Sequence, residues 1–174
     1  SDFLNILKKG NQFLCQAEII FSEVYGFSLQ ISKVDINFNL GDLEKRKQET
    51  IDKLKAEGIF DSNKSKIAPV VIKRIALIAS TSTNGYEDFY KQLKNNQYGY
   101  IFEVTDFPAS VQGENAIPEI CNQLEKLNSL DFDIVAIIRG GGSKLDLDVF
   151  NNYNIAKAIA LHNLPVYTGI GHES

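Results

Sequence analysis

Residues Ile134–Ser143 read Ile-Val-Ala-Ile-Ile-Arg-Gly-Gly-Gly-Ser, and no other stretch narrows the fold class as much. The first half is an unbroken apolar run, Ile134–Ile138, which lies between Asp133 and Arg139. Such a run is typical of a strand buried on both faces, as in a parallel sheet. The second half contains three glycines, Gly140–Gly142, whose backbone torsions are the freest of any residue. The stretch therefore predicts a buried strand that ends in a glycine turn.

Short apolar strands of this kind recur along residues 70–174, and helical patterns separate them. The expected strands are 75–79, 100–104, 134–138 and 165–168, and the expected helices are 86–95, 118–130 and 147–161. Strands and helices that alternate in this way are typical of a parallel sheet covered by helices. We therefore predict an α/β fold, a parallel sheet with helices on both faces.

Residues 12–38 follow a different pattern, in which apolar side chains alternate with mainly polar ones. The alternation predicts a β-hairpin or meander with Gly26 at a turn. Two or three strands alone are marginally stable, so we expect them to belong to a larger sheet. Residues 41–58 are expected to form a charged connecting helix that ends at Gly58. The polar stretch 61–69 is expected to be a linker at a domain boundary.

The composition is that of a globular protein, with 44% hydrophobic and 23% charged residues. The net charge of -4 counts against nucleic-acid binding, although the sign of a local cleft matters more than the total. No run reaches the ~18 apolar residues of a membrane span, and the N-terminus lacks a signal-peptide layout. Cys15 and Cys121 lack metal-type spacing and are predicted to be reduced core thiols. We therefore expect a cytoplasmic protein with no membrane partner.

Both ends of the sequence lead us to expect a fragment. There is no methionine, even at position 1, and the chain stops at Ser174, just after an apolar strand. We therefore expect the α/β domain to be truncated at its carboxyl end.

Three polar or glycine-rich loops leave the carboxyl ends of predicted strands, and they are Ser80–Gly85, Arg139–Ser143 and Thr168–Ser174. In an open α/β sheet the carboxyl ends of the strands lie at one edge, and ligands bind there. The functional site is therefore predicted at this edge.

Within the second loop, the N–H groups of Gly140, Gly141 and Gly142 can turn toward an anion and approach it closely. Ser143 can add a hydroxyl donor, and Arg139 can hold phosphate oxygens with its guanidinium group. A flexible turn beside a surface arginine is the alternative, because three glycines alone are not specific. The stretch does not match the G-x-x-x-x-G-K-[ST] pattern of an ordinary P-loop. It is predicted to bind phosphate.

Ionisable residues near these loops are candidates for proton transfer. His172 follows the last strand and can act as a general acid or base, although a single histidine is more often structural. Asp88, near the start of a helix, can orient water or simply offset the helix dipole. Asp146 and Asp148 can line the site, although Asp146 is expected to cap the following helix. His162, inside a helix, is expected to be an ordinary surface residue.

Joined together, these residues favour phosphoryl chemistry, with Arg139 and the glycine amides stabilising charge on a phosphate. The sequence lacks the cluster of acidic residues that is typical of a two-metal nuclease site. It therefore predicts no required cofactor, without excluding a divalent metal.

Several short stretches combine in a specific order and spacing. In chain order they are Gly58-Ile59-Phe60-Asp61, Ile78-Ala79-Ser80, Ala109-Ser110-Val111-Gln112-Gly113, Ile138-Arg139-Gly140-Gly141-Gly142-Ser143, Asp146-Leu147, Phe150-Asn151, Leu164-Pro165-Val166 and Gly169-Ile170-Gly171-His172-Glu173. This combination resembles the large subunit of exodeoxyribonuclease VII over most of the chain, from about Gly10 onward. Ser174 departs from the family, which has threonine there.

The resemblance implies part of an enzyme that degrades single-stranded DNA to short oligonucleotides. It implies that residues 1–40 are the end of an OB-fold that binds the strand, that 41–69 connect, and that 70–174 are the catalytic domain. It also implies a partner, the exodeoxyribonuclease VII small subunit, which binds through C-terminal regions beyond this sequence. Some members of the family need no divalent metal.

By the same resemblance, Asp88, Arg139 and His172 match the functional aspartate, arginine and histidine of the family. The hypothesis is that His172 acts as general acid or base in phosphodiester hydrolysis, while Arg139 and the glycine amides stabilise the transition state. We expect this fragment alone to be inactive or nearly so. Two other function classes stay open, namely a nucleotide- or sugar-phosphate-binding enzyme and a non-catalytic single-stranded DNA binding module.

Overall fold

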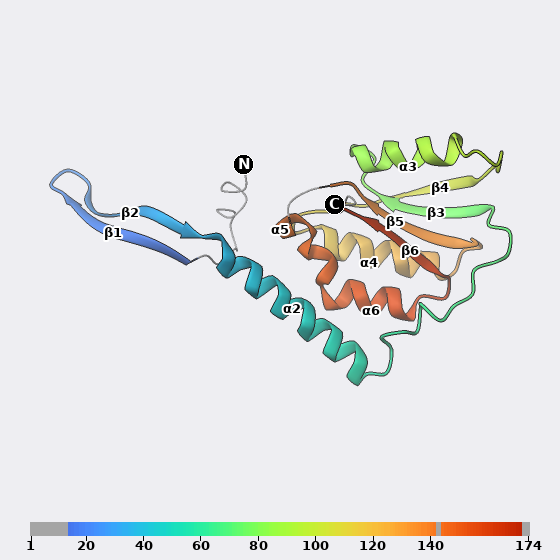
Figure 1. Cartoon of the computed structure of the whole chain (residues 1–174), viewed down its shortest axis with the longest axis horizontal. Helices are drawn as coiled ribbons and strands as arrows, with labels where there is room; N and C mark the ends of the chain where they lie inside the picture. Colours follow the sequence, from blue (N-terminus) through green and yellow to red (C-terminus); the bar gives the residue numbers. More distant parts are fainter. Residues whose placement is uncertain (1–13, 142–143, 172–174) are drawn as a thin grey trace. The chain divides into compact units, whose positions relative to one another are not determined.

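The computed structural model describes residues 14–141 and 144–171 (Figure 1). Its chain divides into two compact units, residues 1–46 and residues 47–174.

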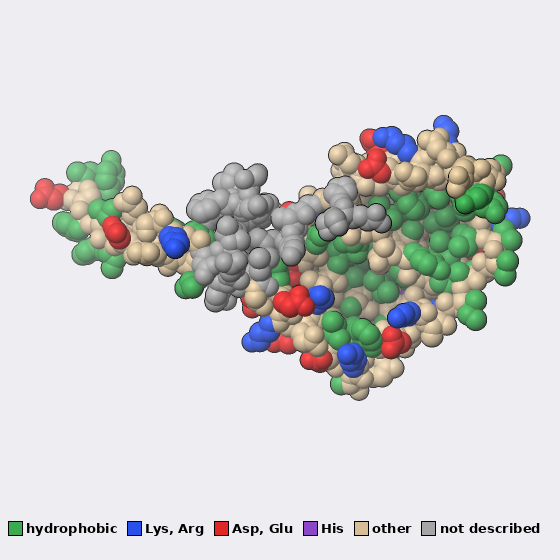
Figure 2. Space-filling model, viewed as in Figure 1, with side chains coloured by type: hydrophobic (Ala, Val, Ile, Leu, Met, Phe, Trp, Pro, Cys, Tyr) green, Lys and Arg blue, Asp and Glu red, His purple; other side chains and the backbone are tan. Residues whose placement is uncertain are grey.

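The first unit contains the predicted hairpin. Strands β1 (Leu14–Ser22) and β2 (Gly26–Asp35) pair antiparallel, and Ser22 lies opposite Gly26. Gly26 has a φ of +70°, a left-handed conformation that glycine adopts without strain at the turn. Large apolar side chains are exposed along both strands, and Figure 2 shows them gathered at the hairpin. Within the described part of the chain no third strand pairs with the hairpin, so the larger sheet stays a prediction.

The second unit is built on a four-stranded parallel sheet. Its strands are β3 (Arg74–Ala79), β4 (Glu103–Pro108), β5 (Ile134–Arg139) and β6 (Val166–Ile170), in the spatial order β4-β3-β5-β6. The central strands β3 and β5 are buried along almost their whole length, whereas the edge strands are not. The unbroken apolar runs of β3 and β5 are therefore covered on both faces of the sheet. The predicted parallel sheet is confirmed.

Helices cover both faces of this sheet, as predicted. Figure 1 shows α3 (Asn84–Lys94) on one face and α4 (Ala116–Leu127) and α6 (Tyr153–Leu161) on the other. Alternate strand residues point to opposite faces. Ile75 and Leu77 thus pack with side chains of α3, while Ala76 and Ile78 pack with α4 and α6.

The predicted strand 100–104 is placed wrongly, because β4 begins only at Glu103. The side chain of Asn96 accepts from the backbone N–H of Tyr100 at 2.9 Å and donates to its carbonyl oxygen at 2.8 Å. Both backbone groups of Tyr100 are then occupied and cannot join the sheet. The first link to β3 is the bond from the N–H of Glu103 to the carbonyl of Lys73, at 2.7 Å.

The predicted helix 147–161 is broken into three pieces. They are α5 (Lys144–Leu147), a 3-10 helix (Asp148–Asn151) and α6. Asn152 has extended backbone torsions, and its side chain accepts from the N–H of Asn154 at 2.9 Å. An asparagine in this position is a strong helix N-cap, so α6 starts at Tyr153. Asn152, and not Asp146, caps this helix.

The second half of α2 (Ile36–Ala56) packs with the α/β unit. The hydroxyl of Thr50 donates to the carbonyl of Asn151 at 2.9 Å, and Lys157 forms a 2.9 Å salt bridge with Glu57. The hydrogen bonds of Tyr153 and Lys157 hold the pKa of Glu57 below its usual range. These contacts tie residues 50–57 to the region around α6.

Asp133 aligns the amino ends of the two central strands. Its Oδ2 accepts from the backbone N–H groups of Arg74 and Lys73, each at 2.8 Å, and its Oδ1 accepts from the side chain of Arg74 at 3.2 Å. These hydrogen bonds favour the charged carboxylate and lower the pKa of Asp133. The side chain therefore fixes where β3 starts beside β5.

The two cysteines are free. Cys121 is partly buried and packs against the core on the α4 side, and burial raises the pKa of its thiol. Cys15 lies on the hairpin and not in this core. Over residues 14–141 and 144–171, no helix combines the length and apolar character needed to cross a bilayer.

The prediction that His162 is a surface residue is wrong, because its side chain is fully buried. His162 directly follows α6, and its Nε2 lies 3.1 Å from the carbonyl oxygen of Leu124 in α4. The backbone N–H of Leu164 donates to Nδ1 at 3.1 Å, so the ring proton sits on Nε2 in the neutral form. Desolvation lowers the pKa of His162. The residue joins the ends of two helices as a neutral side chain.

Protonation of His162 should make stability depend on pH. The unfolded chain takes up this proton below its ordinary pKa of about 6.5, whereas the folded protein resists it, so stability is full above that pH and falls below it. We expect the free energy of unfolding to fall by about 1 kcal/mol between pH 7 and pH 5.5, measured by urea unfolding. His162→Gln should abolish this fall, and His172→Gln, the matched control, should keep it. An unchanged pH dependence in His162→Gln would contradict the assignment.

Candidate functional site

The candidate site lies at the carboxyl edge of the sheet, between β3 and β5. From β3 the chain runs to β4 on one side, and it then crosses to β5 on the other side. From β5 the chain continues to β6 on that other side, so β3 and β5 flank the point where the strand order reverses, which is the usual place of a ligand site in α/β proteins.

At this point two glycines bring the loops into direct contact. A Cβ atom on Gly85 would lie 2.4 Å from the backbone N of Gly140 and 2.7 Å from its Cα. A Cβ atom on Gly140 would in turn lie 3.0 Å from the backbone N of Gly85. Only two residues without side chains fit at this distance. The amino end of α3 thus lies against the turn after β5.

The amino end of α3 presents N–H groups with no side-chain cap. Thr83 is the N-cap residue, but its hydroxyl donates to the carbonyl of Ser80 at 2.7 Å. The same hydroxyl oxygen accepts no hydrogen bond from the first turn of the helix. The first N–H groups of a helix carry a partial positive charge and attract anions.

Asp106 in β4 holds α3 in this position. Its two carboxylate oxygens accept from the hydroxyls of Tyr86 and Tyr90, each at 2.8 Å. Burial, with the bond to Asp106 second, raises the pKa of Tyr90, so its hydroxyl stays a donor. The amino end of α3 is therefore oriented by two hydrogen bonds as well as by the glycine contact.

Arg139 is the centre of the site, and its side chain is only 6% exposed. Its Nη1 donates to the carbonyl oxygens of Gly140, at 2.6 Å, and of Gly141, while its Nη2 donates to Oε1 of Gln112 at 3.1 Å. All three acceptors are uncharged, and within residues 14–141 and 144–171 no carboxylate pairs with this guanidinium. Among the described residues, no carboxylate therefore neutralises its positive charge.

Arg139 also orients the glycine turn. Its guanidinium holds the carbonyl of Gly140, and the peptide bonds of the described chain are trans. In a trans peptide the carbonyl and the following N–H point in opposite directions. The N–H of Gly141 is therefore turned away from the guanidinium, where it can donate to an anion.

Gln112 is a site residue that sequence reasoning missed. It lies in the loop after β4, 27 residues before Arg139, and it reaches that arginine through its side-chain carbonyl. In the sequence, the stretch Ala109–Gly113 is notable only for its resemblance to the family. The motif that contains Gln112 can be found in the sequence, but the role of Gln112 depends on a contact between two loops.

The carboxyl end of β6 completes the edge. The N–H of Gly171 donates to the backbone carbonyl of Arg139 at 3.1 Å. The predicted acid–base residue His172 follows Gly171 directly but lies outside the described residues, as do Gly142 and Ser143. Their predicted roles stay predictions.

Two of the predicted aspartates, Asp88 and Asp148, have partners other than Arg139. Asp88 lies on the outer side of α3, where its carboxylate is 64% exposed and 3.8 Å from the ammonium of Lys91. Asp148 starts the 3-10 helix and accepts from the side chain of Asn151 at 3.2 Å. Among the side chains that the structure describes, no three His, Cys, Asp or Glu residues gather as a metal site.

The glycine contact gives a direct test of the site geometry. Gly85→Ala should lower the free energy of unfolding by about 1–3 kcal/mol, because its Cβ would overlap the backbone of Gly140. Gly41→Ala is the matched control, since a Cβ at this helical position meets nothing within 4 Å. Chemical denaturation of both variants would measure the difference. Equal stability of the two variants would show that the loops do not touch.

Comparison with known proteins gives a consistent answer. The family model described as "Exonuclease VII, large subunit" matches residues 59–174. The exodeoxyribonuclease 7 large subunit of Campylobacter lari is 33% identical over 166 residues, which are 95% of this chain and 43% of that protein. The protein of the same name from Campylobacter fetus is 37% identical over 134 residues, which are 77% of this chain and 34% of that protein.

A protein from a third organism is also similar. The exodeoxyribonuclease 7 large subunit of Mycoplasma mycoides is 29% identical over 170 residues, which are 96% of this chain and 36% of that protein. The chain thus spans less than half the length of these relatives. The match confirms the resemblance seen in the sequence motifs. The chain therefore belongs to the exonuclease VII large subunit family.

Proposed function

We propose that this chain carries the catalytic site of an exodeoxyribonuclease that hydrolyses phosphodiester bonds of single-stranded DNA to short oligonucleotides. The observation that carries the proposal is Arg139, a buried arginine whose described partners are all uncharged. It lies under a glycine turn and beside the amino end of a helix. This combination suits a phosphate, and the names of the relatives identify the polymer as DNA.

The scissile phosphate would sit at the glycine turn. The N–H of Gly141 and the first N–H groups of α3 would donate to its oxygens, and Arg139 would supply positive charge from below. Donors held in place before the reaction stabilise the extra negative charge of the transition state at little reorganisation cost. Gln112 is a positioning residue, because it holds the Nη2 group of Arg139.

Proton transfer would fall to His172, the residue after Gly171. Its neighbour Gly171 is bonded to the backbone of Arg139, which supports a place for His172 near the phosphate. A histidine titrates near neutral pH and can take a proton from water or give one to the leaving oxygen. Asp88, whose exposed carboxylate lies near Lys91 on α3, stays a prediction as the family's functional aspartate.

The proposed enzyme would work together with a second protein. The small subunit of exodeoxyribonuclease VII would be its partner, as the name "large subunit" suggests. The hairpin would guide the strand as part of an OB-fold, and the enzyme would work in the cytoplasm without an obligatory metal. Cleavage assays with and without a chelator test the last point.

Replacement of Arg139 tests the catalytic assignment. The variant is tested in the complete large subunit with its small subunit. Arg139→Ala should reduce cleavage of an end-labelled single strand by about 10²–10³-fold, because the turn loses the hydrogen bonds and the positive charge of the guanidinium. The cleavage activity of Arg139→Lys should also fall sharply. One ammonium group lacks the planar fork of a guanidinium and cannot bond the two carbonyls and Gln112 in the same geometry. Arg46→Ala is the control, because this exposed arginine pairs with Asp42 far along the sequence from the turn.

The outcomes separate the function classes. Wild-type cleavage by Arg139→Ala would refute the assignment. If the wild-type complex bound single-stranded DNA in a salt-sensitive way but never cut it, the protein would be a binding module. Thermal stabilisation by ATP or sugar phosphates, and not by oligonucleotides, would indicate a small-molecule enzyme.

A further inference from the structure

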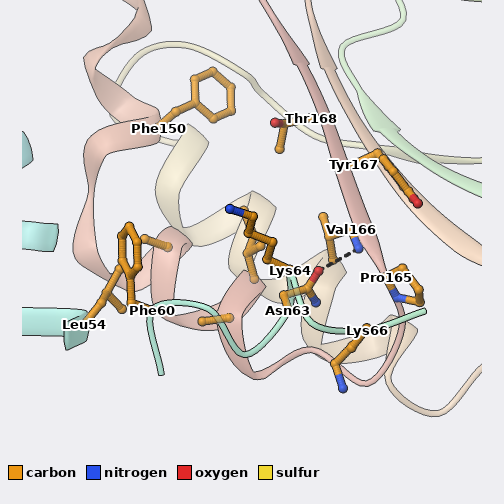
Figure 3. A pocket seen from close by; sticks show the side chains of 13 residues that line it. Leu54, Phe60, Asn63, Lys64, Lys66, Phe150, Pro165, Val166, Tyr167 and Thr168 are labelled. Carbon is orange, nitrogen blue, oxygen red and sulfur yellow. Dashed lines mark hydrogen bonds between the residues drawn. The ribbon is translucent and has the colours of Figure 1, made fainter. Parts of the chain in front are cut away.

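A cavity outside the candidate site lies beside the outer edge of β6 and has a volume of about 460 Å³. The α6 helix, the last turns of α2 and the segment 60–66 form its other walls (Figure 3). Phe60 and Phe150 provide aromatic surface, and the side chain of Phe60 is about half exposed. The reaction proposed at Arg139 does not use this cavity.

The segment 60–66 is fixed to β6 by a side chain that imitates a strand. The buried Asn63 donates from Nδ2 to the carbonyl of Leu164 at 3.0 Å and accepts at Oδ1 from the N–H of Val166 at 2.9 Å. These are the two bonds that a neighbouring strand would make at this place. The residues on either side of Asn63 are therefore held at the edge of the sheet.

This anchor places two lysines along the cavity. In Figure 3 the ammonium of Lys64 points into the cavity toward Phe150 and Thr168, while Lys66 also lines the cavity and its ammonium points away from these two residues. No acidic residue lines the cavity, and in the described part of the chain neither lysine forms a salt bridge. The cavity is thus positive in a protein whose net charge is -4.

One end of the cavity approaches the candidate active site. Thr168 lines it and pairs with Ile137, and two residues further Ile170 pairs with Arg139. Two strand residues span about 7 Å. Phe150 lines the same end and belongs to the 3-10 helix that follows α5. A chain-like ligand at Arg139 can therefore continue into the cavity.

We propose that this cavity binds the nucleotides of a DNA single strand that adjoin the phosphate at Arg139, with Lys64 and Lys66 holding successive phosphates. The inference rests on the function proposed above. An acidic peptide would also satisfy the charge, but the aromatic walls fit flat bases between the phosphates. The direct continuation to the glycine turn, which suits a phosphate, also favours nucleic acid.

The test compares two double variants of this chain. The cavity variant, Lys64→Ala with Lys66→Ala, removes the two cavity charges. The control variant, Lys73→Ala with Lys126→Ala, removes the same charge from exposed residues near the amino end of β3 and the carboxyl end of α4. Binding of a fluorescent 20-nucleotide oligothymidine would be measured by anisotropy over a salt series. The cavity variant should bind roughly tenfold more weakly at low salt, and its salt slope should fall by about 1.4 relative to wild type, or about 0.7 for each lost phosphate contact. The control variant should stay close to wild type.

Two further measurements give the result that would overturn the inference. A phosphorylated dinucleotide is too short to reach from Arg139 along the cavity to both lysines. It should therefore bind equally well to the wild type, the cavity variant and the control variant. If the cavity variant bound the long strand as well as the control variant did, the cavity would not be part of the DNA path. A poly-glutamate peptide that bound more tightly than the oligonucleotide, and lost binding only in the cavity variant, would instead assign the surface to an acidic protein segment.

The experiment is independent of the one on Arg139. Wild-type cleavage by Arg139→Ala together with the expected loss in the cavity variant would overturn the proposed catalysis and leave the binding path standing. Normal binding by the cavity variant together with loss of cleavage in Arg139→Ala would overturn only the path.

Discussion

The close approach of Gly85 to Gly140 is the constraint on which the rest of the site depends. A side chain at Gly85 would meet the backbone of Gly140 at 2.4 Å, so the two loops can touch only because both residues are glycines. The contact brings the amino end of α3 to the turn after β5. Two sources of N–H groups, one from a helix and one from a turn, are thereby placed at the same end of the sheet.

Arg139 adds a buried positive charge beside this contact. A buried cation costs free energy unless its donors are hydrogen-bonded, and here two carbonyls of its own turn and Gln112 accept from it. Because these acceptors are neutral, the arginine is satisfied without losing its charge. The same bonds set the direction of the Gly141 N–H, so one side chain supplies both the charge and the shape of the site.

The two edges of the sheet are used differently. At the β4 edge, Asp106 binds Tyr86 and Tyr90 of α3 and so orients the helix whose amino end serves the site. At the β6 edge, the side chain of Asn63 forms hydrogen bonds with backbone groups of Leu164 and Val166. The cavity lined by Lys64 and Thr168 begins there. The first edge positions the site, and the second leaves room for a ligand that extends from it.

Much of the fold could be predicted from the sequence by itself, because strand and helix periodicity depends on near neighbours. The run Ile134–Ile138 and its glycines predicted a buried strand, its turn and the edge that carries the site, and the motifs identified the family. Only the tertiary structure decided that His162 is buried, that Gln112 serves Arg139, and that Asp88 faces solvent. Each depends on packing between segments far apart in the chain, as in the 38 residues between His162 and Leu124. No local pattern records such a contact.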